Sequence, residues 1–142
     1  MNRKGFTLIE LLAIIVILAV LALIGTPIVT NIINSTRLSA AARTCDAVVS
    51  AAKNLYSTSV MNNPNFGGAK ITFSSTGVSV TATVEGDAVS NFDYENTLPT
   101  TGEIVIAQDG TMTYGDLTVN TYYCTSSKND GKYTCSQAEK KL

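Results

Sequence analysis

Fourteen consecutive residues without a polar side chain, residues 11–24, constrain this chain more than any other feature. With their largely apolar flanks they extend over residues 6–29, a stretch that would be about 36 Å long as an α-helix and could cross a bilayer. A secretory signal peptide has a shorter apolar core that ends at a small-residue cleavage site, and no such site follows this stretch. We therefore expect residues 6–29 to form a membrane-spanning helix rather than a secretory signal peptide.

The rest of the chain is polar, and the whole chain is close to neutral. It has 10 Lys and Arg residues, 11 Asp and Glu residues and no His, so its formal net charge is -1. This balance argues against binding nucleic acid through bulk charge, and we expect Lys140 and Lys141 to form a solvated tail rather than a DNA contact. The absence of His removes the commonest general base and metal ligand. No phosphate loop, nucleophile elbow or dinucleotide fingerprint occurs, so we expect no enzyme, no cofactor and no sequence-specific nucleic-acid partner.

Glu10 is a carboxylate near the start of the apolar run. A carboxylate in hydrocarbon costs several kcal/mol unless it lies near the interface or is paired, so such a residue often marks a function. The alternative is an acidic residue in the first helical turn, where the helix dipole favours it. The composition of this segment alone leaves both interpretations open.

Residues 4–12 read KGFTLIELL, and this motif surrounds Glu10. It resembles the class III signal of type IV prepilins and pseudopilins, a short basic leader ending in Gly before Phe-Thr-Leu-Ile-Glu and an apolar stretch. The match covers about the first 30 residues directly. The resemblance implies that a prepilin peptidase removes residues 1–5 by cutting after Gly5, and that Phe6 then becomes an N-methylated N-terminus. It also implies that Glu10 pairs with the Phe6 amine of a neighbouring subunit during assembly.

The resemblance further implies a structural subunit of a type IV pilus, serving motility, adhesion or DNA uptake. Before assembly the subunit would cross the cytoplasmic membrane once, in contact with lipid and with the assembly platform. Its N-terminus would lie inside, as Arg3 and Lys4 also predict by the positive-inside rule. Afterwards it would lie in a cell-surface filament of identical subunits. Two alternatives stay open: a pseudopilin of a type II secretion or competence system, and a minor tip pilin that acts as an adhesin.

Gly25 and Pro27 lie near the end of the apolar stretch, and both residue types weaken an α-helix. Pro27 has no N–H and clashes with the carbonyl one turn earlier, while Gly25 adds backbone freedom. We expect the helix to kink or loosen at this point. The resemblance adds the alternative that the segment unwinds on assembly.

After Pro27 the pattern becomes amphipathic, and residues 30–57 are expected to continue the helix. It is expected to end near Ser57, before the breaker cluster at residues 62–65. A helix over residues 6–57 would be about 78 Å long, too long for a chain of 142 residues to bury, so its N-terminal half is expected to protrude. The apolar stripe recurs at spacings of three and four and comprises Leu38, Ala41, Cys45, Val48, Ala52, Leu55 and Ser59.

Residues 58–142 are expected to form an extracellular head. In this part of the chain apolar residues recur at every second position, as in β-strands. Residues 85–99 are predicted to be mostly loop, anchored by Phe92 and Tyr94, and Asp109-Gly110 is a hairpin turn. A small antiparallel sheet on the helix stripe gives an α+β arrangement, which the resemblance identifies as the pilin fold. Short strands are predicted over residues 70–73, 78–84, 103–107, 111–114 and 117–123.

Three cysteines complete the set of candidate residues. Cys124 and Cys135 flank the turn Asn129-Asp130-Gly131 and lie outside the membrane in this topology, where disulfides persist. The resemblance favours a Cys124–Cys135 bridge that closes a C-terminal loop. Cys45 is then a free core thiol, with a bridge from Cys45 to either partner as the alternative. Three cysteines without a histidine predict no zinc site, and the acidic residues follow no calcium-loop spacing.

Overall fold

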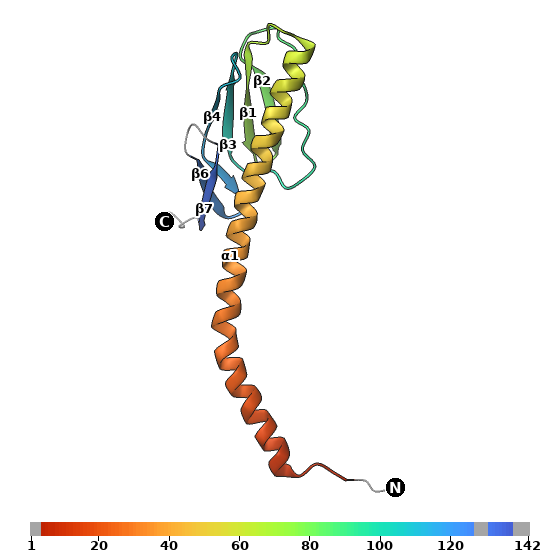
Figure 1. Cartoon of the computed structure of the whole chain (residues 1–142), viewed down its shortest axis with the longest axis vertical. Coiled ribbons are helices and arrows are strands. Elements are labelled where there is room, and N and C mark those ends of the chain that lie inside the picture. The colour runs from red at the N-terminus through yellow and green to blue at the C-terminus, as the bar shows by residue number, and fades with distance from the viewer. Residues whose placement is uncertain (1–3, 127–130, 138–142) are drawn as a thin grey trace. The chain divides into compact units, whose positions relative to one another are not determined.

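A computed structural model describes residues 4–126 and 131–137 (Figure 1). Arg3, the Asn129-Asp130 part of the expected turn, Lys140 and Lys141 lie outside the described residues. Within these ranges one helix, α1 (Leu8–Asn62), is followed by seven strands, all paired antiparallel. The expected α+β arrangement, a long N-terminal helix packed on antiparallel β-structure, is confirmed. Packing divides the chain into two units, Met1–Arg37 and Leu38–Leu142.

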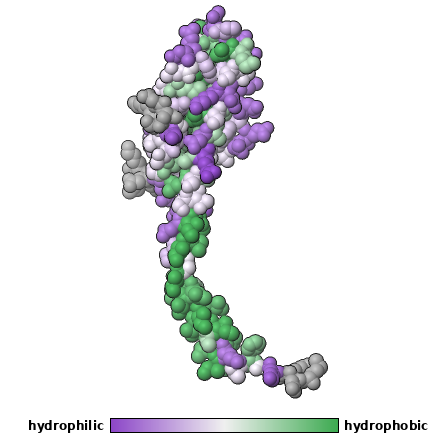
Figure 2. Space-filling view, viewed as in Figure 1, coloured by the Kyte–Doolittle hydropathy of each residue, from purple (hydrophilic) through white to green (hydrophobic). Residues whose placement is uncertain are grey.

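The first unit holds the apolar part of α1, and its large side chains are uncovered. Leu8 is 84% exposed, and Ile33, the least exposed of the large apolar side chains in this unit, is still 42% exposed. Figure 2 shows this hydrophobic surface along the helix. Among the described residues, α1 is the helix that is long and apolar enough to cross a membrane.

In the second unit α1 carries the stripe that the spacing predicts. Leu38 is half-buried, Cys45, Val48 and Ala52 are fully buried, and Val49 adds a neighbouring buried position. Residues three or four apart lie on one helix face, so this face can be covered continuously. The buried residues of α1 are Ala41, Cys45, Val48, Val49, Ala52, Leu55 and Ser59.

The helix ends at Asn62, beyond the predicted end near Ser57. The stripe itself explains the extension, because Ser59 is fully buried and its hydroxyl accepts a hydrogen bond from the Ser90 amide at 3.3 Å. Termination coincides with Asn63-Pro64, since a residue before proline is disfavoured in the α region. The helix therefore runs up to the breaker cluster, with no intervening loop between residue 57 and the cluster.

The strands form two sheets rather than the single small sheet that was expected. The first has the order β2-β1-β3-β4, and the second has the order β5-β6-β7. A bridge between Thr101 and Thr118 connects the two sheets. The first sheet contains β1 (Gly68–Ser74), β2 (Gly77–Ala82), β3 (Gly102–Ala107) and β4 (Met112–Tyr114), and the second contains β5 (Leu117–Val119), β6 (Tyr122–Ser126) and β7 (Tyr133–Gln137).

Buried and exposed side chains alternate along the central strands, and the buried ones form the core. Ile71 on β1 pairs with Ile104 on β3, and both side chains are fully buried, as is Ile106. On the opposite face Lys70 and Glu103 form an ion pair of 2.6 Å with both side chains about half exposed. Such an exposed pair contributes less than about 1 kcal/mol, so burial rather than charge pairing stabilises this sheet.

Two of the strand predictions were wrong. Residues 117–123 were predicted as one strand, but β5 and β6 are two strands of a hairpin that turns at Asn120. Asn120 has a φ of 55°, a left-handed conformation that asparagine tolerates better than most residues. The strand β7 was missed because its residues are mostly polar, with Tyr133 as its single buried side chain.

The loop after β2 is anchored as predicted. Phe92 packs edge-on against Phe73 of β1 with ring centroids 5.7 Å apart, and Tyr94 lies 6.1 Å from Phe92. Both aromatic residues of the loop are partly buried against the core. Aromatic pairs of this kind are worth about 0.5–1.5 kcal/mol beyond their area burial, so they help to hold an otherwise irregular segment.

We predict that Leu55→Ala lowers the free energy of unfolding of the head by about 2–5 kcal/mol, because it removes buried methyl groups and leaves a cavity. Leu55 is 3% exposed. The measurement is chemical denaturation of the full chain in detergent, followed by the near-ultraviolet circular dichroism of its tyrosines. Met61→Ala is the control, since Met61 lies on the same helix and is 84% exposed. Equal losses for the two variants would contradict this account of the core.

Candidate functional site

The N-terminal end of α1 is closed by Thr7 and Glu10. The Thr7 amide donates to Oε2 of Glu10 at 2.9 Å, and the Glu10 amide donates to Oγ1 of Thr7 at 3.3 Å. The Leu11 amide donates to the Thr7 carbonyl at 3.2 Å. This reciprocal arrangement is a capping box, which satisfies two of the amides that the first helical turn leaves without partners.

The capping box was not predicted, although the Thr-x-x-Glu spacing is its sequence signal. It agrees with the interpretation of Glu10 as an acidic residue of the first helical turn, where the N-terminal dipole favours a negative charge. A functional role for Glu10 remains compatible with it. Oε2 accepts the Thr7 amide, while the side chain is exposed to solvent and a carboxylate can accept several donors at once. The carboxylate can therefore accept a further donor without losing its cap.

Residues 4–7 precede the helix and have no regular secondary structure. Phe6 is 85% exposed. A Cβ added at Gly5 would meet no atom within 4 Å, and Gly5 does not have a positive φ. The fold of this chain therefore gives no packing or conformational reason for a glycine at position 5.

Gly25 and Pro27 lie inside α1, which continues as helix on both sides of them. Pro27 cannot donate to the Leu23 carbonyl, so one bond of the helical ladder is lost here. The Thr26 hydroxyl donates to the Ala22 carbonyl at 2.7 Å, and that of Thr30 donates to the Pro27 carbonyl at 3.0 Å. Like Gly5, Gly25 has no neighbour within 4 Å of an added Cβ. The kink and the unwinding on assembly both remain predictions.

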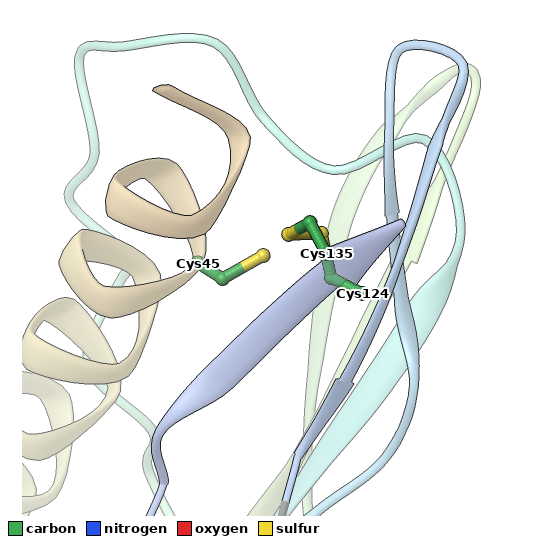
Figure 3. A group of neighbouring side chains, drawn as sticks. All are labelled: Cys45, Cys124 and Cys135. Atoms are coloured by element: carbon green, nitrogen blue, oxygen red, sulfur yellow. A yellow bond between two sulfur atoms is a disulfide. The ribbon is translucent and has the colours of Figure 1, made fainter. Parts of the chain in front are cut away.

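In the second unit the structure brings all three cysteines together (Figure 3). Cys124 and Cys135 are direct partners in the register of β6 and β7 and form a disulfide. The Cys45 side chain points from α1 toward this bond, and the three Sγ atoms lie within 4.8 Å of one another. Cys45 is the free thiol. Burial, with a smaller effect of the Asp46 carboxylate, raises the pKa of Cys45 to about 12, so this thiol is protonated at neutral pH.

Several acidic residues of the head have structural partners. The Asp87 carboxylate accepts from the Gly67 amide at 2.8 Å and from Nδ2 of Asn63 at 3.2 Å, which ties the loop to the end of α1. Asp109 accepts from the Thr111 amide at 2.9 Å, within the predicted hairpin turn. Hydrogen bonds from Thr111 lower the pKa of Asp109. These carboxylates are thus accounted for by turns and connections.

We predict that replacing both Cys124 and Cys135 by Ala lowers the stability of the head by about 2–3 kcal/mol, since the bond closes a short loop of the unfolded chain. The two residues are 11 positions apart. The measurement is chemical denaturation in metal-free buffer, with and without a reductant. Reduction should destabilise the unmodified chain by a similar amount and leave the double variant unchanged. If reduction had no effect on the unmodified chain, the bond would not contribute to stability.

Residues 1–26 match the family model described as the prokaryotic N-terminal methylation motif. No curated protein and no solved structure matches the chain. The match spans Gly5, Phe6, Glu10 and the start of the apolar helix, and it stops before the head. It includes the capping box and most of the uncovered apolar side chains. The chain therefore carries, at residues 1–26, the class III prepilin signal of type IV pilins and pseudopilins.

Proposed function

We propose that the mature chain is a structural subunit of a type IV pilus that polymerises through residues 6–29. The observation that carries this proposal is the combination of a prepilin signal with an apolar helix that the chain leaves uncovered. A methylation motif of this kind points to a structural protein. The function would then lie in the filament and its uses in motility, adhesion or DNA uptake.

The exposed apolar helix needs a covering environment. Burying one Leu or Ile side chain is worth about 1.5–3 kcal/mol, and soluble proteins rarely expose large contiguous apolar patches. Lipid would cover the helix while the subunit waits in the cytoplasmic membrane, with Lys4 on the inner side and the head outside. In a filament the same helices of neighbouring subunits would cover one another. A homopolymer thus provides a second environment for the surface that the membrane covers first.

Processing would create the second group needed for assembly. A prepilin peptidase would cut after Gly5, removing residues 1–5, and Phe6 would then carry a methylated amine. The segment is suited to a protease because it has no regular structure before the cap, and Phe6 is exposed. Since nothing in the fold requires a glycine at position 5, recognition by the peptidase is the simplest reason for this residue.

Glu10 would pair with the Phe6 amine of a neighbouring subunit. In a filament core both charges would leave water, and an unpaired charge there costs several kcal/mol. The two charges would meet only when neighbouring helices are shifted along the filament axis by one particular distance. The pair would therefore fix the register of the helices more than it would add net stability. The capping box supports this role because it orients the carboxylate through Oε2, while the side chain stays exposed to an incoming amine.

A pseudopilin of a type II secretion or competence system would share this N-terminal segment, and a minor tip pilin would share it as well. The C-terminal disulfide loop favours the pilin. The three roles differ in abundance and location. A major pilin is the principal protein of surface filaments, a tip pilin is a rare component of them, and a pseudopilin stays with the envelope.

We predict that Glu10→Gln impairs filament assembly while cleavage after Gly5 continues. A glutamine at the third helical position still accepts the Thr7 amide, so the variant removes the charge and retains the cap. The measurement is the amount of subunit in filaments sheared from cells, relative to the processed subunit in the membrane.

Two matched variants separate charge from capping. Glu85→Gln removes an exposed carboxylate outside the helix and should assemble normally. Thr7→Ala removes the side-chain half of the cap but retains the Glu10 charge, so it should assemble better than Glu10→Gln. Normal filament yield from Glu10→Gln would show that the charge pair is not needed.

A further inference from the structure

We propose that Cys45, Cys124 and Cys135 form a zinc site when the disulfide between the latter two is reduced. The site joins α1 to both strands of the C-terminal hairpin, β6 and β7. It goes beyond the proposed assembly function, since it concerns the head alone. It also reverses the expectation from the sequence, where three cysteines without a histidine predict no metal site.

Geometry is the first argument. The three Sγ atoms lie within 4.8 Å of one another, and among the described residues this is the group of potential ligands close enough to hold a metal ion. A Zn–S distance of about 2.3 Å in a tetrahedral site places neighbouring sulfurs about 3.8 Å apart. Once the Cys124–Cys135 bond is broken, its two sulfurs separate to van der Waals contact. The triangle then approaches the required size with small side-chain movements.

Burial is the second argument. Cys45 and Cys124 are fully buried, and Cys135 is partly exposed. The metal would thus have a dry side formed by the helix and β6, and a side open to solvent near β7. Three protein ligands leave one tetrahedral position, which water can occupy from the solvent side.

The chemistry balances with a small thiol as reductant. Two molecules of the thiol reduce the Cys124–Cys135 bond to two thiols and are themselves oxidised to one disulfide. One Zn²⁺ then replaces three thiol protons, which are released to water. The bound cluster carries a net charge of one minus, from three thiolates and one divalent cation.

The consequence is that two states of the same cluster can hold the C-terminal hairpin. In the oxidised state a covalent bond joins β6 to β7, and Cys45 only packs against it. In the reduced state the metal would join β6, β7 and α1 at one point. The hairpin would therefore remain attached to the helix in surroundings where the disulfide does not persist.

The test uses the full chain in detergent, reduced with a phosphine under anaerobic conditions and freed of reductant. Zinc is added in competition with a chromophoric chelator, and bound metal is counted by elemental analysis. We expect one zinc per reduced chain. Cobalt as a probe should produce a thiolate-to-cobalt charge-transfer band. Cys45→Ala is the matched variant, and the oxidised unmodified chain is the second control.

Loss of a residue that only hydrogen-bonds a metal ligand lowers metal affinity by about 10–100-fold. Loss of Cys45, which would be a ligand itself, should lower it at least as much. The oxidised chain should bind no zinc at this site. Zinc should also slow alkylation of all three cysteines of the reduced, unmodified chain, a readout that does not depend on how any variant folds. Equal zinc affinity in Cys45→Ala, equal binding by the oxidised chain, or unprotected Cys45 in the presence of zinc would each overturn the proposal.

Discussion

The rest of this structure depends on one constraint: residues 8–33 of α1 present apolar side chains that the chain itself does not cover. Ile33, 42% exposed, is the least exposed large apolar side chain of this surface. In water such a surface is strongly unfavourable, so the segment requires lipid or other copies of itself. The prepilin signal at residues 1–26 starts at the same end of the chain, and under the proposed function processing there would let the segment pass from one environment to the other.

The N-terminal cap shows how one side chain can serve both environments. Glu10 first satisfies the amide of Thr7, as any residue of a capping box would. The side chain stays exposed, and it lies close in sequence to Phe6, the residue that processing would turn into the N-terminus. A carboxylate that is already oriented by the helix loses less entropy when it pairs, which is the general advantage of a preorganised site. Under the proposed assembly, capping and pairing would be successive uses of the same group.

The second part of α1 differs from the first in the distribution of its apolar side chains. Small and medium side chains such as Cys45, Val48 and Ala52 form a narrow buried face, while the other positions of this segment are mainly polar residues and alanines. The head covers this face with strands that alternate, including Ile71 and Ile104 in register. One continuous helix therefore combines a segment that is apolar all round with a segment that is apolar along one stripe, and these patterns are typical of a membrane or polymer helix and of a surface helix, respectively.

Much of this arrangement could be predicted from local patterns. The stripe through Cys45 and Leu55 follows from helical spacing, and the hairpin at Asp109-Gly110 follows from turn chemistry. The end of the helix was placed too early, near Ser57, although the helical spacing already included Ser59 in the stripe. Only the hydrogen bond that Ser59 accepts from Ser90 has no local signal. Strand β7 was missed because a polar edge strand has little periodic signal. The meeting of Cys45 with the disulfide could not be predicted, since it depends on how β6 and β7 pack against α1.

The most direct test of the central claim is an intact-mass measurement of filaments sheared from cells, with and without reduction. The account predicts that the dominant species begins at Phe6, carries one methyl group on its amine and gains two hydrogens on reduction of one disulfide. Peptide mapping should place that bond between Cys124 and Cys135. Chains that retain residues 1–5 everywhere would contradict processing at Gly5. Processed chains confined to the membrane, with none in the sheared fraction, would contradict the role as a major pilus subunit.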